Sequence, residues 1–221
     1  MKEVFEEAVA RLDNGENVVV ATVVRTKGST PQKPGAKLLV RQDGSGAGTL
    51  GGGCVEGDIW FAAKQLMQAK GGAEYREYEL NEELAADDGL VCGGTMFFLI
   101  DPVYGPGDYL PYAKEIDAAY KGQGAVALAT IVKSALGGGS QIGSKLFIRE
   151  DGSTDGDLGE EAMNLDAISR ANQLMIHGQN EYVIDQSGAE YFIEAYTTPV
   201  SYTHLRAHET RHDLVCRLLL E

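Results

Sequence analysis

The chain has 221 residues, of which 43 % are apolar and 24 % are charged, and these values are ordinary for a globular protein with a buried core. Its formal net charge of −14 argues against contact with nucleic-acid backbone or anionic lipid, so we expect neither nucleic acid nor a membrane as a partner. No stretch approaches the roughly 20 apolar residues of a membrane helix. We therefore expect a cytoplasmic protein whose three widely spaced cysteines are reduced thiols.

Residues 200–221 differ in character from the rest of the chain. They hold three of the four histidines, and His204, His208 and His212 would lie on one face of a helix as metal ligands do. The segment nevertheless reads, from Val200 onward, as the translation of a common transposase sequencing adapter. We therefore interpret it as an adapter-derived, non-native tail and exclude it from functional reasoning.

The rest of the sequence repeats itself. Lys37 aligns with Lys145 and Arg41 with Arg149, a shift of 108 residues that continues without a gap across the surrounding segment. We expect a first repeat at 1–103 and a second, degenerate repeat at 108–199, packed together as one domain. The glycines of 105–107 form the expected joint between them.

The same order of elements is predicted for both repeats. Helices are predicted where apolar residues recur with a period near 3.6, and strands where β-branched residues form runs. In the first repeat we expect helices near 4–12 and 55–68 and strands at 18–24, 37–41, 74–79 and 95–100. In the second repeat we expect helices near 112–120 and 164–175 and strands at 125–132, 145–149, 181–184 and 190–195. This order predicts an α/β fold, a mixed sheet with helices, built from two tandem pseudo-repeats.

The repeats differ in one turn that could carry chemistry. The first has Gly52, Gly53 and Cys54 where the second has two glutamates and an alanine at 160–162. Cys54 falls at the start of a predicted helix, where unpaired backbone N–H groups and the helix dipole favour a thiolate. The glycine run can turn its own N–H groups into an anion nest. This pattern predicts a thiolate beside an oxyanion site.

Two further segments of the first repeat belong to the same hypothesis. Cys92 precedes a glycine pair at 93–94 and could be a second soft ligand or a resolving thiol. Four cations at positions 25, 27, 33 and 37 surround a Gly-Ser-Thr-Pro loop at 28–31, which is a candidate phosphate or pterin clamp. We expect the functional pocket between the Gly51–Cys54 turn and the Cys92–Gly94 turn.

Plainer readings of these residues compete with the functional ones. A free cysteine is more often a small core residue than a reactive one, and a glycine run can be only a tight turn. Trp60 is expected to pack in the core, and His177 to lie at the surface. Without a native histidine near the cysteines, a nucleophilic dyad has no evident base, and two cysteines do not complete a zinc site.

The order and spacing of three motifs resemble the XdhC/CoxI family. The motifs are TVVRTKGSTPQKPGAKLLV, GTLGGGCVEGDI and VCGGTMFFLIDP. The resemblance implies a xanthine dehydrogenase accessory factor that binds molybdenum cofactor transiently and assists its sulfuration with a cysteine desulfurase. The cofactor would then be delivered to the apo-enzyme of a xanthine dehydrogenase-like or CO dehydrogenase-like hydroxylase. Many family members continue into a C-terminal Rossmann-like domain, which we expect to be absent from these 221 residues.

The sequence therefore predicts a cofactor chaperone rather than a turnover enzyme. It names no catalytic residue and no metal ligand. The expected cofactor-binding residues are Cys54, Cys92, Gly51, Gly52, Gly53, Gly93, Gly94, Arg25, Lys27, Ser29 and Lys37. The alternatives are a thiol-dependent redox or sulfur-transfer enzyme that uses both cysteines, and a regulatory module that binds a phosphorylated metabolite. The sequence leaves open whether the protein forms a homodimer.

Overall fold

A computed structural model describes residues 1–80, 93–107, 109–135 and 140–198. The first repeat contains α1 (Lys2–Asp13), β1 (Val18–Lys27), β2 (Lys37–Arg41), β3 (Gly46–Gly48), α2 (Gly53–Ala69), β4 (Glu74–Glu79) and β5 (Thr95–Val103). The second contains α4 (Tyr109–Tyr120), β6 (Val126–Lys133), β7 (Lys145–Arg149), β8 (Thr154–Gly156), α5 (Glu161–His177), β9 (Asn180–Ile184) and β10 (Glu190–Tyr196). The predicted α/β class and the tandem duplication are confirmed.

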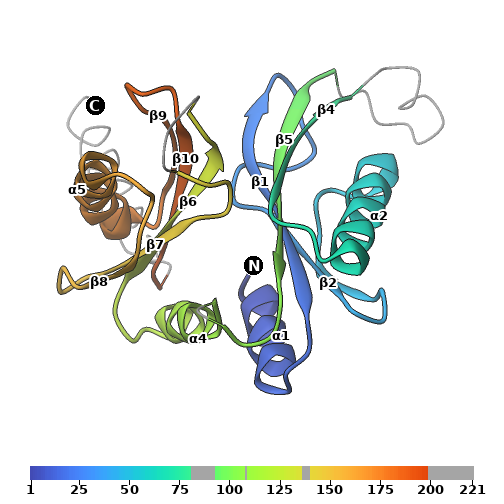
Figure 1. The fold of residues 1–221 in the computed structure, drawn as a ribbon, viewed down its shortest axis with the longest axis horizontal. Helices are drawn as coiled ribbons and strands as arrows, with labels where there is room; N and C mark the ends of the chain where they lie inside the picture. Colours follow the sequence, from blue (N-terminus) through green and yellow to red (C-terminus); the bar gives the residue numbers. More distant parts are fainter. Residues whose placement is uncertain (81–92, 108, 136–139, 199–221) are drawn as a thin grey trace, which may run out of the picture.

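Each repeat forms its own five-stranded sheet (Figure 1). The strand orders are β3-β2-β1-β5-β4 and β8-β7-β6-β10-β9, which are the same order in the two repeats. All pairings among the described strands are antiparallel, where the sequence predicted a mixed sheet. The short strands β3 and β8 follow the Asp-Gly-Ser turns and were not predicted, because three residues are too few for a recognisable alternation.

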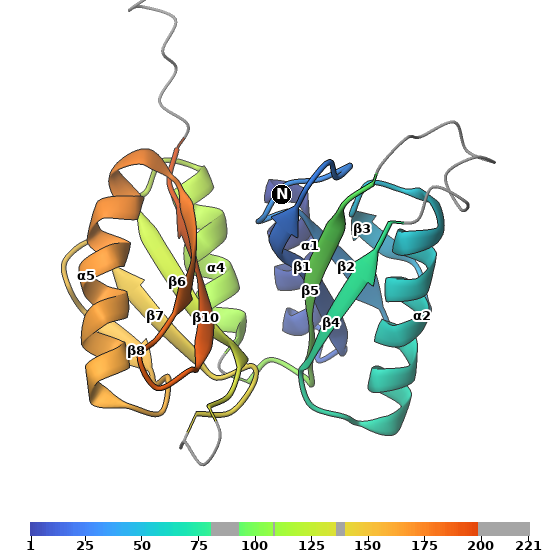
Figure 2. The same ribbon diagram turned by 90° about the horizontal axis from the view of Figure 1, so that it is seen from above.

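The two sheets face each other across the middle of the molecule, and a helix covers the outer face of each. Figures 1 and 2 show α2 and α5 on the two outer flanks, with α1 and α4 side by side at one end. β1 is buried on both faces, as its apolar run predicted. Val19 packs in the cluster beneath α2, whereas Val20 packs in the cluster formed with α1 and α4.

We call the interface between the inner faces of the two sheets the seam. A pseudo-two-fold axis relates the two repeats across it. Val24, Leu99, Val132 and Phe192 form a buried cluster there. Two ion pairs cross it, Lys37 with Glu194 at 2.8 Å and Lys145 with Asp101 at 2.6 Å. The two lysines occupy the same position in the two repeats. So do the two acids, which stand opposite Val20 on β1 and Leu128 on β6.

Two cation–π contacts in the seam also follow the pseudo-two-fold symmetry. Arg25 lies over the ring of Tyr182 at 5.4 Å, and Lys133 over the ring of Tyr75 at 4.3 Å. Each cation comes from one repeat and each ring from the other, so the repeats stabilise each other reciprocally. None of the helices in the described part of the chain is both long and apolar enough to cross a membrane.

Candidate functional site in the first repeat

Three glycine-bearing loops meet at one end of the first sheet, and we call residues 28–31, 51–54 and 93–94 the glycine-loop site. A side-chain carbon on Gly51 would lie 2.8 Å from the Cβ of Pro31. A side-chain carbon on Gly94 would lie 2.7 Å from the carbonyl oxygen of Lys27 and would overlap that of Ser29. The loop at 28–31 therefore passes between the other two and touches both, and only glycine permits these approaches.

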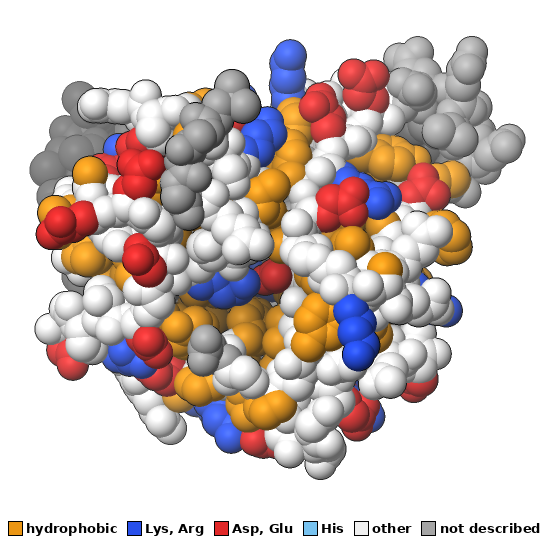
Figure 3. All heavy atoms as spheres, viewed as in Figure 1, with side chains coloured by type: hydrophobic (Ala, Val, Ile, Leu, Met, Phe, Trp, Pro, Cys, Tyr) orange, Lys and Arg blue, Asp and Glu red, His pale blue; other side chains and the backbone are white. Residues whose placement is uncertain are grey.

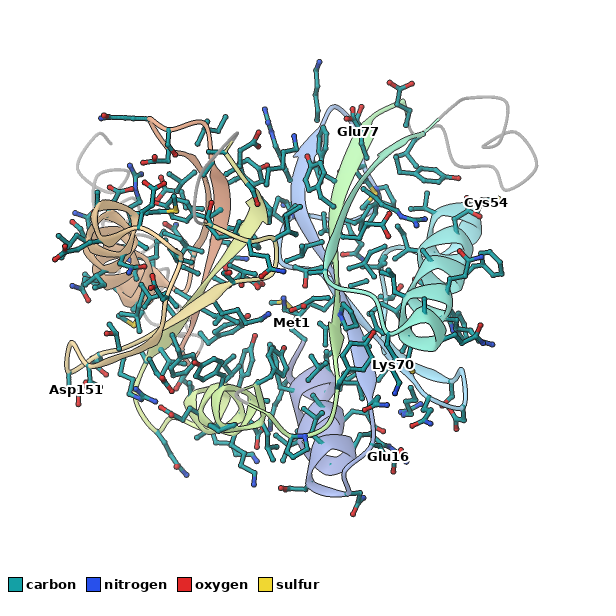
Figure 4. The ribbon with its side chains drawn as sticks, viewed as in Figure 1. Met1, Glu16, Cys54, Lys70, Glu77 and Asp151 are labelled. Atoms are coloured by element: carbon teal, nitrogen blue, oxygen red, sulfur yellow. The ribbon has the colours of Figure 1, made fainter. Side chains whose placement is uncertain are left out.

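Cys54 lies at the surface, in the first turn of α2. Its thiol is free and exposed, so the plainer reading of this residue as core filling does not hold. Figure 4 shows it at the outer edge of the molecule, away from the seam. Cys92 falls outside the described residues, so Gly93 and Gly94 alone represent the second of the two turns between which we expected the functional pocket.

Cys54 has two polar neighbours, Asp58 and Tyr78, which the sequence analysis did not identify. The hydroxyl of Tyr78 on β4 donates a hydrogen bond to Asp58 Oδ2 at 2.9 Å. Burial, the bond to Asp58 and the nearby charges of Asp58 and Cys54 raise the pKa of Tyr78 above its ordinary value. Asp58 could have been found from its position four residues after Cys54 on a helix. Tyr78 had no such signal, because the sheet brings it there from a distant strand.

The predicted anion nest is filled by the protein itself. Glu56 Oε2 accepts hydrogen bonds from the backbone N–H groups of Leu50 at 2.8 Å and Gly52 at 3.1 Å, and from the hydroxyl of Thr49 at 2.7 Å. Burial opposes ionisation of this carboxyl, but the three hydrogen bonds outweigh it and keep the pKa of Glu56 below its ordinary value. An acidic side chain in the first turn of a helix is attracted to these N–H groups.

The predicted cations divide between the glycine-loop site and the seam. Lys27 and Ser29 are exposed, and their backbone lies directly against Gly94. Arg25 instead lies over the rings of Phe97 and Tyr182 in the seam. Lys37 is buried, and its ammonium donates to Glu194 and to the hydroxyl of Thr22. The structure therefore gathers Lys27 and Ser29 with the glycine loops and uses Arg25 and Lys37 to join the repeats.

The site combines one soft, accessible sulfur with a constrained and exposed backbone surface. Among the described residues, no group of three or more side chains is placed to hold a metal ion. Trp60, on the same helix, packs partly buried against the core beneath α2. These features define a duplicated α/β protein with a thiol-bearing surface site in its first repeat.

The chain belongs to the XdhC and CoxI family, whose model matches residues 11–79 and 119–185. The two matched segments fall in the two repeats, and together they cover more than half of the chain.

Three known proteins illustrate the relationship. The chain is 34 % identical over 94 residues to the molybdenum cofactor insertion chaperone PaoD of Escherichia coli, covering 42 % of this chain and 29 % of that protein. It is 43 % identical over 51 residues to a probable xanthine dehydrogenase subunit of Bacillus subtilis, covering 23 % and 16 %. The crystal structure of a xanthine dehydrogenase from Bacillus halodurans shares the fold, with a TM-score of 0.59 and 21 % identity over 88 % of this chain and 53 % of that one. The chain thus spans less than a third of the curated relatives it matches.

Proposed function

We propose that the chain is a molybdenum cofactor maturation factor that receives the cofactor at the glycine-loop site and holds it for insertion into an enzyme. The observation that carries the proposal is the convergence of three loops, one of which bears an exposed thiol, in a member of the XdhC and CoxI family. The name of the relative PaoD supports the cargo, since it describes a molybdenum cofactor insertion chaperone.

The residues at the site suit the chemistry of this cargo. Molybdopterin carries a phosphate and a metal held by sulfur, so it requires anion donors and tolerates a soft sulfur contact. Cys54 supplies the sulfur, and Lys27 and Ser29 supply exposed polar groups on the loop that lies against Gly94. The bare backbone at Gly52, Gly53 and Gly93 allows a flat ligand to approach closely. Because Glu56 fills the nest, the anionic part of the cargo contacts Lys27 and Ser29 rather than the glycine N–H groups.

The finer steps are part of the same proposal. The factor acts as a chaperone in the cytoplasm, and a cysteine desulfurase provides the sulfur for sulfuration of the bound cofactor. Its receiving partner is the apo-enzyme of a molybdenum hydroxylase of the xanthine dehydrogenase or CO dehydrogenase type. Cys92 and Gly94 complete the proposed contact surface together with Gly51.

Cofactor retention by purified protein tests the proposal. The chain is co-expressed with a molybdopterin synthesis pathway, and bound pterin and molybdenum are measured by fluorescence and elemental mass spectrometry. Cys54→Ser keeps the size and polarity of the side chain but removes the soft ligand, so we expect retained molybdenum to fall at least tenfold. Ala162→Ser is the matched control, because Ala162 holds the equivalent exposed position on α5. It should retain cofactor as the wild type does.

Two results would contradict the proposal. One is a wild-type protein that retains no pterin under conditions in which a known insertion chaperone does. The other is a Cys54→Ser variant that retains as much molybdenum as Ala162→Ser, which would show that the thiol takes no part in holding the cargo.

A further inference from the structure

A cavity lies in the second repeat between the turn after β7 and the last turns of α5, and we call it the flank pocket. Its volume is about 400 Å³, and it is lined among others by Ala125, Glu150, Asp151, Gly152, Asn172 and Ile176. Figure 4 shows Asp151 and Cys54 at opposite outer edges of the molecule. The flank pocket is therefore separate from the glycine-loop site, and the inference below does not rest on the proposed function.

The two repeats form the same turn at this place. Asp43 in the first repeat and Asp151 in the second each accept, through Oδ1, from the N–H and the hydroxyl of the serine two residues later. The glycines that follow the two aspartates, Gly44 and Gly152, have φ of 86° and 84°. Because the backbones of the turns match, a difference between the two places comes from the neighbouring side chains.

A lysine covers the turn in the first repeat but not in the second. A side-chain carbon added to Gly44 would lie 3.0 Å from Nζ of Lys64 on α2, so this ammonium lies directly against the turn. The equivalent residue on α5 is Asn172, because both helices have 17 residues and the repeats are offset by 108. No atom of the described residues lies within 4 Å of a carbon added to Gly152. The place that Lys64 fills in the first repeat is thus open in the second.

The open place is also the more acidic of the two. The aspartate is common to both turns, but Gln42 of the first repeat is replaced by Glu150, and Lys64 is replaced by Asn172. The side chains around the turn are therefore neutral in sum in the first repeat and carry two negative charges in the second. The second repeat has gained an acid where it has lost the cation.

The two acids of the flank pocket are held in place by the second repeat itself. The serine hydroxyl and N–H that bond to Asp151 keep the pKa of this carboxyl below its ordinary value. Glu150 Oε2 accepts from the Ala125 N–H at 3.1 Å. Neither acid forms an ion pair with a lysine or arginine of the described residues, and the adjacent Arg149 pairs with Glu115 at 2.6 Å. The flank pocket thus offers two carboxylates that have no cation of their own.

The rest of the flank pocket suits an alkyl chain that ends in a cation. Ala125, Met175 and Ile176 line it with apolar surface, and Ile176 is 66 % exposed. Met175 and Ile176 belong to the last turn of α5, where the negative end of the helix dipole attracts a cation. Figure 3 shows that acidic side chains predominate over basic ones on this flank of the second repeat. A lysine-like group can lay its stem along such a wall and place its charge at the polar edge.

We propose that the flank pocket binds the ammonium end of an aminoalkyl group, with its charge at the two carboxylates and its stem against Met175 and Ile176. The ligand takes the place that Lys64 takes in the first repeat. A primary ammonium has three N–H donors and no acceptor, which matches a pair of carboxylates. The source is a lysine side chain of a partner protein or a free aliphatic diamine, since both present this chemistry. The volume lies within the range of small-molecule sites.

Three small probes test the proposal with the full chain. Nα-acetyl-lysine methylamide presents a lysine side chain as a protein does, its Nε-acetylated form keeps the stem but loses the charge, and diaminobutane represents free diamines. Titrations at physiological ionic strength are followed by nuclear magnetic resonance through the amide signals of Ala125 and Gly152. We expect saturable shifts of both signals with at least one of the two amines. The Nε-acetylated form should bind at least fivefold more weakly than the tighter amine, and the identity of that amine indicates the source.

A lysine introduced on α5 tests whether Lys64 imitates the ligand. Asn172→Lys gives the second repeat the side chain that covers the turn in the first, so it should compete from within the protein and weaken amine binding at least fivefold. Gln173→Lys is the matched control, because it adds the same charge at the next exposed position of the helix. This position is turned by about 100° around the helix axis, so the affinity should change less than twofold.

Three results would overturn the proposal. The first is the absence of saturable shifts at Ala125 and Gly152 with both amines. The second is binding of the Nε-acetylated form as tight as that of the tighter amine, which would show that the charge is not recognised. The third is equal amine affinity in Asn172→Lys and Gln173→Lys, which would show that the probes respond to the overall charge of the flank and not to the flank pocket.

Discussion

The first turns of α2 and α5 hold equivalent positions in the two repeats, yet their backbones differ. Both helices have 17 residues. The residue before α2 is Gly52 at φ 75°, whereas the residue before α5 is Glu160 at φ −140°. Gly51 and its counterpart Gly159 share a positive φ of 110° and 101°. The fold shared by the two repeats therefore needs a glycine only at the position of Gly51 and Gly159. Gly52 and Gly53 are specific to the first repeat, so the shared fold does not explain them.

The polar groups that hold these turns have exchanged places between the repeats. In the first repeat the carboxylate is on the helix, as Glu56, and the hydroxyl partner Thr49 is in the turn. In the second the carboxylate is in the turn, as Asp157, and the helix supplies Asn164, whose side-chain oxygen accepts from the Leu158 N–H at 2.9 Å. Both helices thus keep a side-chain bond to the backbone N–H of the turn, at Leu50 and at Leu158, while the carboxylate changes its place. The thiol and the bare glycine backbone distinguish the first repeat chemically.

The largest expected effect tests the two ion pairs of the seam against each other. The side chains of Lys37 and Glu194 are 4 % and 7 % exposed, and those of Lys145 and Asp101 are 17 % and 12 % exposed. Lys37→Ala leaves the charge of Glu194 buried and unpaired, so we expect a loss of about 3 to 5 kcal/mol in the free energy of unfolding. Lys145→Ala should cost about half as much, because both members of its pair are less completely buried than Lys37 and Glu194. Denaturant titrations measure both, and equal losses would contradict the difference in burial.

The next effect tests the close approach of the loops. We expect Gly94→Ala to cost about 2 to 3 kcal/mol, since the added carbon would collide with the carbonyl groups of Lys27 and Ser29. Gly93→Ala is the matched control, because nothing lies within 4 Å of a carbon added there. It should change the free energy of unfolding by less than about 0.5 kcal/mol. If thermal melts show the same small effect for both, the loops do not touch as the structure places them.

Glu56 should make a smaller and pH-dependent contribution. Its pKa in the folded protein lies below the ordinary 4.5, so its stabilisation is fully present above that value and is lost as the pH falls through the folded pKa. Glu56→Gln should cost about 1 kcal/mol at pH 7, because charged acceptors bond more strongly to N–H groups at a helix start. The difference between variant and wild type should shrink below pH of about 4. A difference that stays constant from pH 7 to pH 3 would show that the charge of Glu56 does not matter.

Most of the fold could be predicted from the sequence, because the repeat supplied two independent readings of each element. β4 begins and ends at the predicted residues, and β1 extends the predicted strand by three residues, to Lys27. The pairing of strands could not be predicted. Periodicity shows that a strand is buried but not which neighbour it pairs with, so the mixed sheet was expected where two antiparallel sheets form.

The candidate site was predicted less completely, for a physical reason. The Cys54 turn was found because it departs from its copy at Ala162. The roles of Lys37 and Arg25 were not found, since both depend on partners in the other repeat, Glu194 and Tyr182. Sequence reasoning grouped these cations with the nearby loop, whereas the fold turns them into the seam.

The smallest expected effect on stability concerns Cys54, and it separates the function of the turn from its folding. Because the thiol is exposed, Cys54→Ser should change the free energy of unfolding by less than about 0.5 kcal/mol, as should Ala162→Cys at the equivalent position on α5. Peptide mapping after brief alkylation of the native protein should find Cys54 modified in the wild type and both positions modified in Ala162→Cys. Resistance of Cys54 in the folded protein, or a large stability loss in Cys54→Ser, would show that the thiol is packed. The glycines of the first repeat would then serve that packing rather than a ligand.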